Sequence, residues 1–189
     1  MPHMKSAFDR LDSLTVTTFR HLKPKSLLYV GWRHDCHPWW HQTFCAELGI
    51  IDVGILEIFP ANVSDAEQKI WSGYFKGVAV ELQQGDVRSA DWMFLPNDYD
   101  IIFWDHGPEH VSLEDLKVVT PKLFGLAGKM LLYSCPWGSW PQGADDGNEH
   151  ERHLWDVTPD VFEQMGMLTS TVGSPGQENG GEIIAWRCK

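Results

Sequence analysis

The sequence predicts an α/β fold, a doubly wound and mostly parallel seven-stranded sheet that ends in a C-terminal antiparallel hairpin. Short apolar runs of strand length alternate along the chain with segments of helical periodicity, as in parallel sheets covered by helices on both faces. The last apolar run, residues 182–186, follows Gly180 and Gly181. A strand that starts near Gly166 precedes these glycines, so the two strands are expected to form a hairpin.

The first half of the predicted domain holds three strands and two helices. Apolar residues occupy both faces of the first strand, which is typical of a central parallel strand. The third strand alternates apolar and polar residues, which predicts an edge. Ser64 and Glu67 have the spacing of a capping box, so the second helix is expected to begin there. The strands are expected at residues 26–30, 52–58 and 78–82, and the helices between Pro38 and Gly49 and from Ser64 to Gly77.

The second half repeats the alternation around a long loop. Residues 134–155 are rich in Gly, Pro, Trp and Asp, and loops of this length are usually functional or mobile. Residues 1–25 are expected to form an N-terminal capping segment with a weakly periodic helix, and residues 26–189 a single domain. The remaining strands are expected at residues 99–104 and 129–133, and the helices at residues 112–124, interrupted at Pro121, and at residues 158–165.

Composition narrows the possible partners and compartments. The formal net charge of −11 disfavours nucleic acid or an anionic membrane surface as the main partner. The longest apolar runs have strand length, so no membrane-spanning helix is expected. The four cysteines show no disulfide framework and no paired C-x-x-C spacing. We therefore expect reduced thiols and a cytoplasmic location.

The carboxyl ends of the predicted strands carry a consistent set of residues. Ligands of open α/β sheets bind at these ends, where the strand order reverses. The ends read Gly31, Glu57, Asp86 and Asp105 in chain order. An acid that closes the second strand can accept hydrogen bonds from both hydroxyls of a ribose, although a lone acid at a strand end can also be merely solvated. The four ends together predict a nucleotide-like cofactor.

Several segments resemble the class I S-adenosylmethionine-dependent methyltransferases over residues 26–187. Residues 105–110 resemble the D-x-x-x-E-H element that follows the fourth strand in many small-molecule methyltransferases, and Gly128 leads the fifth strand as in the family. Residues 136–143, 146–148 and 153–162 resemble a segment that some members carry after that strand. The resemblance implies a Rossmann-like methyltransferase fold with S-adenosylmethionine as cofactor.

The resemblance also implies roles for individual residues. The family's first motif is rich in glycine, and this chain keeps only its first glycine. Arg33 and Asp35 stand where small residues are expected, and Tyr29 replaces the usual acid, so Asp35 is expected to supply a carboxylate to the cofactor. The implied cofactor-binding residues are Gly31 and Arg33 and Asp35 in the first turn, Glu57 at the ribose, Ile58 against the adenine, Asp86 and Val87 at the adenine edge, and Asp105 on the methyl-transfer side.

Nine histidines include pairs with the spacing of metal ligands. His106 and His110 are four residues apart, and His150 and His153 are three apart. So many histidines produce such pairs by number alone, and His110 already belongs to the methyltransferase-like element, so we assign no metal ligand. His106 is predicted as the catalytic general base because an imidazole titrates near neutral pH. The alternative is a hydrogen-bonded loop histidine.

These observations predict an enzyme that transfers a methyl group from S-adenosylmethionine to a small-molecule acceptor. Trp137 and Trp140 would form part of the acceptor wall, and the acids of the long loop suit a cationic or hydroxyl-rich acceptor. Two alternatives remain open. The altered first turn is compatible with a methyltransferase-like binding or interaction module without catalysis, and the histidine pairs with a metal-dependent hydrolase.

Overall fold

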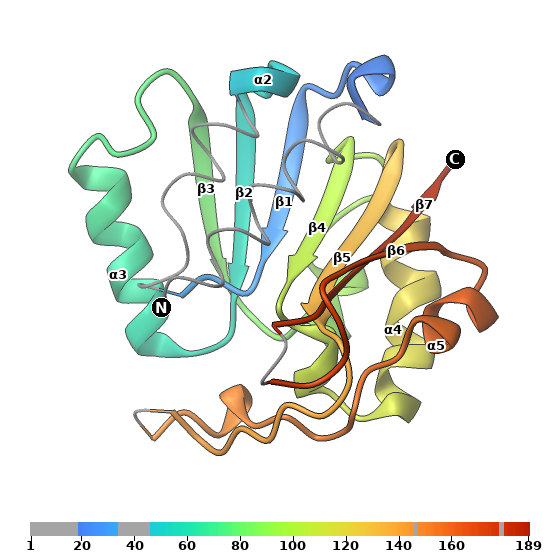
Figure 1. Ribbon diagram of the computed structural model, residues 1–189. Helices are drawn as coiled ribbons and strands as arrows, with labels where there is room; N and C mark the ends of the chain where they lie inside the picture. The colour runs from blue at the N-terminus through green and yellow to red at the C-terminus, as the bar shows by residue number, and fades with distance from the viewer. Residues whose placement is uncertain (1–18, 34–45, 146, 178–179) are drawn as a thin grey trace.

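The computed structural model describes residues 19–33, 46–145, 147–177 and 180–189. This part of the chain forms one seven-stranded sheet in the order β3-β2-β1-β4-β5-β7-β6. The first five strands are parallel, and β7 is antiparallel to both β5 and β6 (Figure 1). The predicted parallel sheet with a closing hairpin is confirmed. The strands are β1 (Ser26–Val30), β2 (Asp52–Glu57), β3 (Ala79–Gln84), β4 (Ile101–Asp105), β5 (Met130–Pro136), β6 (Leu168–Val172) and β7 (Glu182–Cys188).

Burial along the strands follows their place in the sheet. Every residue of β4 and β5 is buried, which only a central strand covered on both faces achieves. No residue of β3 is buried, and this strand lies at the edge as its alternating sequence predicts. The strand order reverses between β1 and β4, because the chain crosses from β3 at one edge back to the centre. This reversal opens the place where ligands of such sheets bind.

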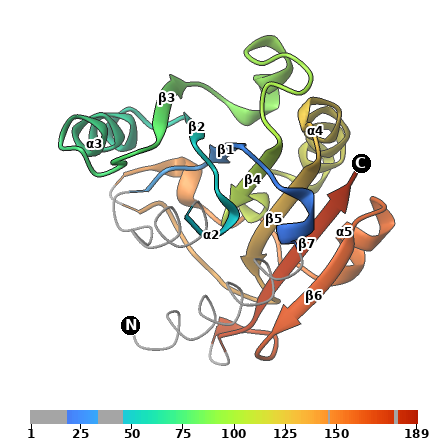
Figure 2. The same cartoon turned by 90° about the horizontal axis from the view of Figure 1, so that it is seen from above.

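Side-chain alternation divides the core into two layers. Leu28 and Val30 pack with one set of helices, and Leu27 and Tyr29 pack on the opposite face. Figure 2 shows α4 and α5 on one side of the sheet and α2 and α3 on the other. Helices on both faces make the sheet doubly wound. The helices are α2 (Ala46–Leu48), α3 (Pro60–Trp71), α4 (Leu113–Leu126) and α5 (Pro159–Gln164), with 3-10 turns η1 (Arg20–Leu22), η3 (Val87–Trp92), η4 (Pro108–His110) and η5 (Glu149–Glu151).

The start of α3 corrects the sequence prediction. The helix begins at Pro60 and not at Ser64. Proline suits the first helical position because its φ is fixed and that position has no intrahelical use for an N–H. The N–H of Phe59 donates to Oε1 of Glu57 at 2.6 Å. The end of β2 therefore leads directly into α3, and Glu57 is fixed at the joint.

Helix α4 runs through Pro121, so the predicted interruption there is wrong. Proline removes one backbone hydrogen bond inside a helix. Leu116, Val119 and Leu123 are buried along one side of α4 and pack against the sheet, and this burial holds the helix together across the missing bond. Ser112 caps the first turn by accepting a hydrogen bond from the N–H of Asp115 at 3.0 Å.

Two predicted helices lie partly outside the described residues. The periodic segment at residues 5–23 is described only from Phe19 onward, and the helix after Pro38 only from Ala46, where Gly49 at φ 74° follows its end. The division of the chain at residue 25 stays a prediction. Within the described residues, no helix combines the length and the apolar character needed to cross a bilayer.

Candidate functional site

A cavity of about 550 Å³ lies at the carboxyl ends of β1, β2 and β4. Residues 137–145 and 147–155 run beneath these strand ends (orange in Figure 1) and contribute the opposite wall. Asp35 lies outside the described residues. The other residues predicted to bind the cofactor or to catalyse line this cavity, namely Gly31, Arg33, Glu57, Ile58, Asp86, Val87, Asp105 and His106. Of the two tryptophans predicted for the acceptor wall, Trp140 lines the cavity, whereas Trp137 packs against the hydrophobic core.

Gly31 turns the chain at the end of β1. Its φ of +87° lies in the left-handed region, which residues with a Cβ rarely adopt. Its N–H donates to the carbonyl of Leu56 at 3.0 Å. A Cβ at this position would stand 3.6 Å from the backbone oxygen of Asp105, an ordinary contact. The backbone conformation, and not the available space, requires glycine here.

Glu57 ends β2 as a buried carboxyl group with 5% exposure. Burial raises the pKa of Glu57 from 4.5 to about 7, although the hydrogen bond from Phe59 opposes this shift. The nearby negative charge of Glu151 raises it further. The side chain therefore lies at the cavity wall as an acceptor whose ionised form is poorly solvated.

The carboxylate of Asp86 is already paired with Arg88. It caps η3 by accepting a hydrogen bond from the N–H of Arg88 at 2.9 Å, and both of its oxygens also contact the Arg88 guanidinium. Partial burial would raise the pKa of Asp86, but the hydrogen bonds and charge of Arg88 outweigh burial and lower it. Asp86 is thus ionised and held in place at the cavity.

Asp105 joins the three central strands. The hydroxyl of Tyr29 in β1 donates to its Oδ2 at 2.7 Å, and the hydroxyl of Ser134 in β5 donates to its Oδ1. The carboxylate is buried, with 6% exposure. Tyr29, which replaces the family's usual acid, therefore binds an acid from the neighbouring strand. Sequence reasoning missed Ser134, whose only signal is its place at the end of the fifth strand.

His106 follows Asp105 with a left-handed φ of 45°. Its Nδ1 lies 3.6 Å from Oε1 of Glu109, and its Nε2 lies 3.4 Å from Oε1 of Glu182. Burial alone would lower the pKa of His106. The negative charges of Glu182 and Glu109 outweigh burial and raise this pKa well above its ordinary value. A general base must be unprotonated, so this shift opposes the predicted role at neutral pH, and the role stays a prediction.

Arg33 connects the first turn to the long loop. Its guanidinium donates to Oδ2 of Asp145 at 2.5 Å and to Oε2 of Glu151 at 3.1 Å. These ion pairs link the two walls of the cavity. Arg33 therefore lies at the predicted place, but its recorded partners are acids of the loop. Sequence reasoning did not connect Arg33 with either acid because they lie far along the chain.

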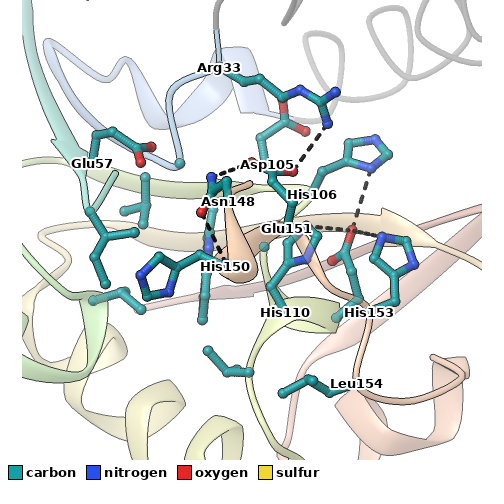
Figure 3. A pocket seen from close by; sticks show the side chains of 18 of the residues that line it. Arg33, Glu57, Asp105, His106, His110, Asn148, His150, Glu151, His153 and Leu154 are labelled. Carbon is teal, nitrogen blue, oxygen red and sulfur yellow. Dashed lines mark hydrogen bonds and ion pairs between the residues drawn. The ribbon is translucent and has the colours of Figure 1, made fainter. Parts of the chain in front are cut away.

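Three histidines gather at the end of the cavity away from Glu57. Figure 3 shows the rings of His106, His110 and His153 together on one side of the pocket, with Glu57 on the other. Nε2 of His110 and Nε2 of His153 each lie 3.9 Å from Oε1 of Glu109. The carboxyl of Glu109 is buried with 1% exposure. Sequence reasoning missed this cluster because the path of the loop brings His153 to the other two residues.

The structure is similar to solved methyltransferases at low sequence identity. The methyltransferase domain of bacterial CtHen1 superposes with a TM-score of 0.65 at 13% identity, covering 97% of this chain and 100% of that chain. Magnesium protoporphyrin IX methyltransferase (ChlM) from Synechocystis PCC 6803 with bound SAH (S-adenosylhomocysteine) gives 0.64 at 13%, covering 100% and 86%. A SAM-dependent methyltransferase from Archaeoglobus fulgidus gives 0.58 at 13%, covering 94% of each chain.

No family model matches the sequence, and a search of the curated proteins finds no match. At 13% sequence identity, structural similarity establishes a shared fold and not a shared activity. The strand order, the antiparallel β7 between β5 and β6, and the cavity at the strand ends agree with that likeness. The chain therefore has the Rossmann-like fold of the class I S-adenosylmethionine-dependent methyltransferases.

Proposed function

We propose that this chain binds S-adenosylmethionine and transfers its methyl group to a small-molecule acceptor. One observation carries the proposal: the left-handed turn at Gly31 and the buried carboxyl of Glu57 face the same cavity at the strand ends. A carboxylate at the end of the second strand is placed to accept hydrogen bonds from ribose hydroxyls. Structures of the similar ChlM contain SAM or SAH.

The residues that line the cavity are placed for the following roles. Glu57 would hold the ribose, and Ile58 would pack against the adenine. Asp86 and Val87 would meet the adenine edge, and the turn at Gly31 would hold the methionine part. Asp105 and His106 lie further along the cavity, on the side where the acceptor would enter. Much of the rate in such a transfer comes from holding nucleophile and methyl donor in line.

The charges around the cavity favour a cationic or hydroxyl-rich acceptor. Glu109 and Glu182 are buried at the histidine end, and Glu149 and Glu151 come from the loop. These acids have cationic partners, but the formal net charge of the chain is −11. A net charge of this sign repels a polyanion, which disfavours nucleic acid as the acceptor. Trp140 also lines this end and provides an apolar surface.

Calorimetric titration with S-adenosylmethionine and with S-adenosylhomocysteine tests the cofactor. We expect saturable binding of both, and Glu57→Ala should weaken each by more than about tenfold because the ribose acceptor is lost. Glu81→Ala is the matched control, since Glu81 lies in β3 and does not line the cavity. Absence of heat from both ligands at high protein concentration would refute the proposal.

An alternative function is a binding module of the same fold without catalysis. The observation that favours it is the pairing of Arg33 and Asp86, both predicted to meet the cofactor, with Asp145 and Arg88. Incubation with a methyl-labelled cofactor and a pool of small metabolites separates the two functions. Labelled product supports transfer, and cofactor binding without label in any acceptor supports the module.

A further inference from the structure

We propose that Glu109, His110 and His153 form a binding site for a divalent transition-metal ion. Glu109 and His110 belong to η4, directly after β4, and His153 follows η5 in the long loop. One potential ligand atom from each residue lies within 4.8 Å of the others. The proposal concerns metal binding itself and does not depend on methyl transfer.

Backbone hydrogen bonds fix the orientation of the two imidazoles. Nδ1 of His110 lies 3.3 Å from the carbonyl of Arg152, and Nδ1 of His153 lies 2.6 Å from the carbonyl of Trp140. A carbonyl can only accept, so each Nδ1 must carry the proton. In a neutral imidazole the lone pair is then on Nε2. Histidine ligands of metals are usually held in this way, with the other ring nitrogen bonded to a carbonyl or carboxylate.

The two Nε2 atoms converge on a buried carboxylate. Both oxygens of Glu109 are buried and have no hydrogen-bond partner among the described residues. The 3.9 Å distances from its Oε1 to Nε2 of His110 and His153 are too long for hydrogen bonds. A buried carboxylate without hydrogen bonds is costly, and Nδ1 of His106, 3.6 Å from Oε1, compensates its charge without a hydrogen bond. A cation between the three residues would coordinate Oε1 together with both lone pairs.

The distances between the ligand atoms are close to those around a bound metal ion. Zinc lies about 2.0–2.1 Å from nitrogen and oxygen ligands, so two ligands of a tetrahedral ion stand about 3.3 Å apart. The observed distances of 3.9 Å exceed this by several tenths of an ångström. Small side-chain rotations would therefore close the site around an ion. Its remaining coordination position would face the cavity, which all three residues line.

Contacts between the two segments already hold the ligands near one another. The N–H of Leu154 donates to the carbonyl of Glu109 at 2.9 Å, and the indole of Trp155 donates to the carbonyl of Val111 at 3.0 Å. These bonds flank His153 on the loop side and Glu109 and His110 on the η4 side. The site is thus positioned before an ion arrives, which limits the entropy lost on binding.

The donor set selects the type of ion. Two imidazoles and one carboxylate suit zinc, iron and related transition metals. Magnesium and calcium prefer sites made mainly of oxygen. We therefore expect Zn²⁺ and Co²⁺ to bind at one ion per chain and Mg²⁺ not to compete at similar concentrations.

Equilibrium titration of chelator-treated protein with Zn²⁺, without cofactor, tests the site. His153→Ala and Glu109→Gln should each weaken binding by more than about 100-fold, because losing an outer-shell partner alone costs roughly 10–100-fold. His150→Ala is the matched control, since His150 lines the same cavity but lies outside the cluster. X-ray absorption of the zinc-loaded chain should show two imidazole ligands.

Two results would overturn the proposal. The first is wild-type protein that binds neither Zn²⁺ nor Co²⁺. The second is an affinity for zinc that is the same in three variants, His153→Ala, Glu109→Gln and His150→Ala. Thermal melting of each variant shows whether it is folded, and titration of the wild type remains decisive if a variant is not. Failure here leaves cofactor binding, which is measured separately, unaffected.

Discussion

Glu57 destabilises the folded chain at the pH where it would bind a cofactor. Its pKa rises from 4.5 to about 7 on folding because it is buried. The folded chain therefore holds this proton more tightly than the unfolded chain, and the free energy of unfolding falls as pH rises from about 4.5 to 7. A shift of this size corresponds to at most about 3 kcal/mol.

Glu57→Gln should remove this pH dependence. We expect the variant to lose about 1–3 kcal/mol less stability than the wild type between pH 5 and pH 8, since an amide cannot ionise. Its Oε1 can still accept from Phe59. Urea denaturation at both pH values measures the difference. Equal pH dependence in the two proteins would contradict the shifted pKa.

Gly31 and Gly125 should respond in opposite directions to alanine. Gly31 has a φ of +87°, where a Cβ is strained, so Gly31→Ala should cost about 1–2 kcal/mol. Gly125 lies in α4 with nothing within 4 Å of an added Cβ, so Gly125→Ala should stabilise the chain by about 0.5–1 kcal/mol. Thermal unfolding of both variants measures the two signs, and equal signs would contradict this account.

At the residue scale, the sequence predicted the residues that follow strands and missed those that depend on loop path. Gly31, Glu57, Asp86 and Asp105 could be predicted together because the ends of parallel strands lie at one edge of a sheet. The partners of Arg33 could not, since the loop that carries Asp145 has no periodic pattern. The path of the same loop also decides where His153 lies.

At the element scale, Arg33 determines how firmly the long loop is held. Arg33→Gln removes the charge that pairs with Asp145 and Glu151. We expect hydrogen exchange in residues 137–145 and 147–155 to rise roughly fivefold, which corresponds to about 1 kcal/mol of local stability. Exchange measured by mass spectrometry tests this.

Arg152→Gln is the control for that experiment. Arg152 pairs with Glu149 at 2.9 Å, and both side chains are largely exposed. Exposed pairs of this kind contribute about 0–1 kcal/mol, so exchange should change little. If both variants exchange equally, the ion pairs of Arg33 do not hold the loop.

Two elements show where local sequence rules lose to context. Ser64 and Glu67 have capping-box spacing, but Pro60 starts the helix one turn earlier, where the buried Glu57 meets it. A proline usually ends a helix, yet α4 continues past Pro121, and its buried side chains continue with it. In both places tertiary contacts, which the local pattern does not contain, decide the boundary.

At the scale of the whole molecule, Tyr29 links the central strands through a buried carboxylate. Tyr29→Phe leaves Asp105 without one of its donors, which should lower the free energy of unfolding by about 1–3 kcal/mol. Tyr133→Phe is the matched control, because Tyr133 is equally buried but donates to the neutral Thr120 at 3.1 Å. It should cost less, about 0.5–1.5 kcal/mol. Denaturant unfolding compares them, and equal losses would refute the special cost at Asp105.

The fold class was predictable because burial and periodicity act along whole strands. Apolar faces located β1 and β4, alternation located the edge strand β3, and the glycines before β7 indicated a hairpin. The place of β7 between β5 and β6 was not predictable, since a hairpin can join a sheet through either of its strands. Only contacts distant in sequence decide which strand faces β5.

This placement matters while the chain is being synthesised. Among the residues that the structure describes, β6 pairs only with β7, and β7 is the strand that covers the outer edge of β5. On the ribosome β6 emerges first but has no strand to join until β7 follows. Until then the outer edge of β5, whose residues are all buried in the finished fold, has unpaired backbone groups. Other unfinished chains can pair with such an edge. A chaperone that shields nascent strands would therefore protect this chain most during the short interval before β7 inserts.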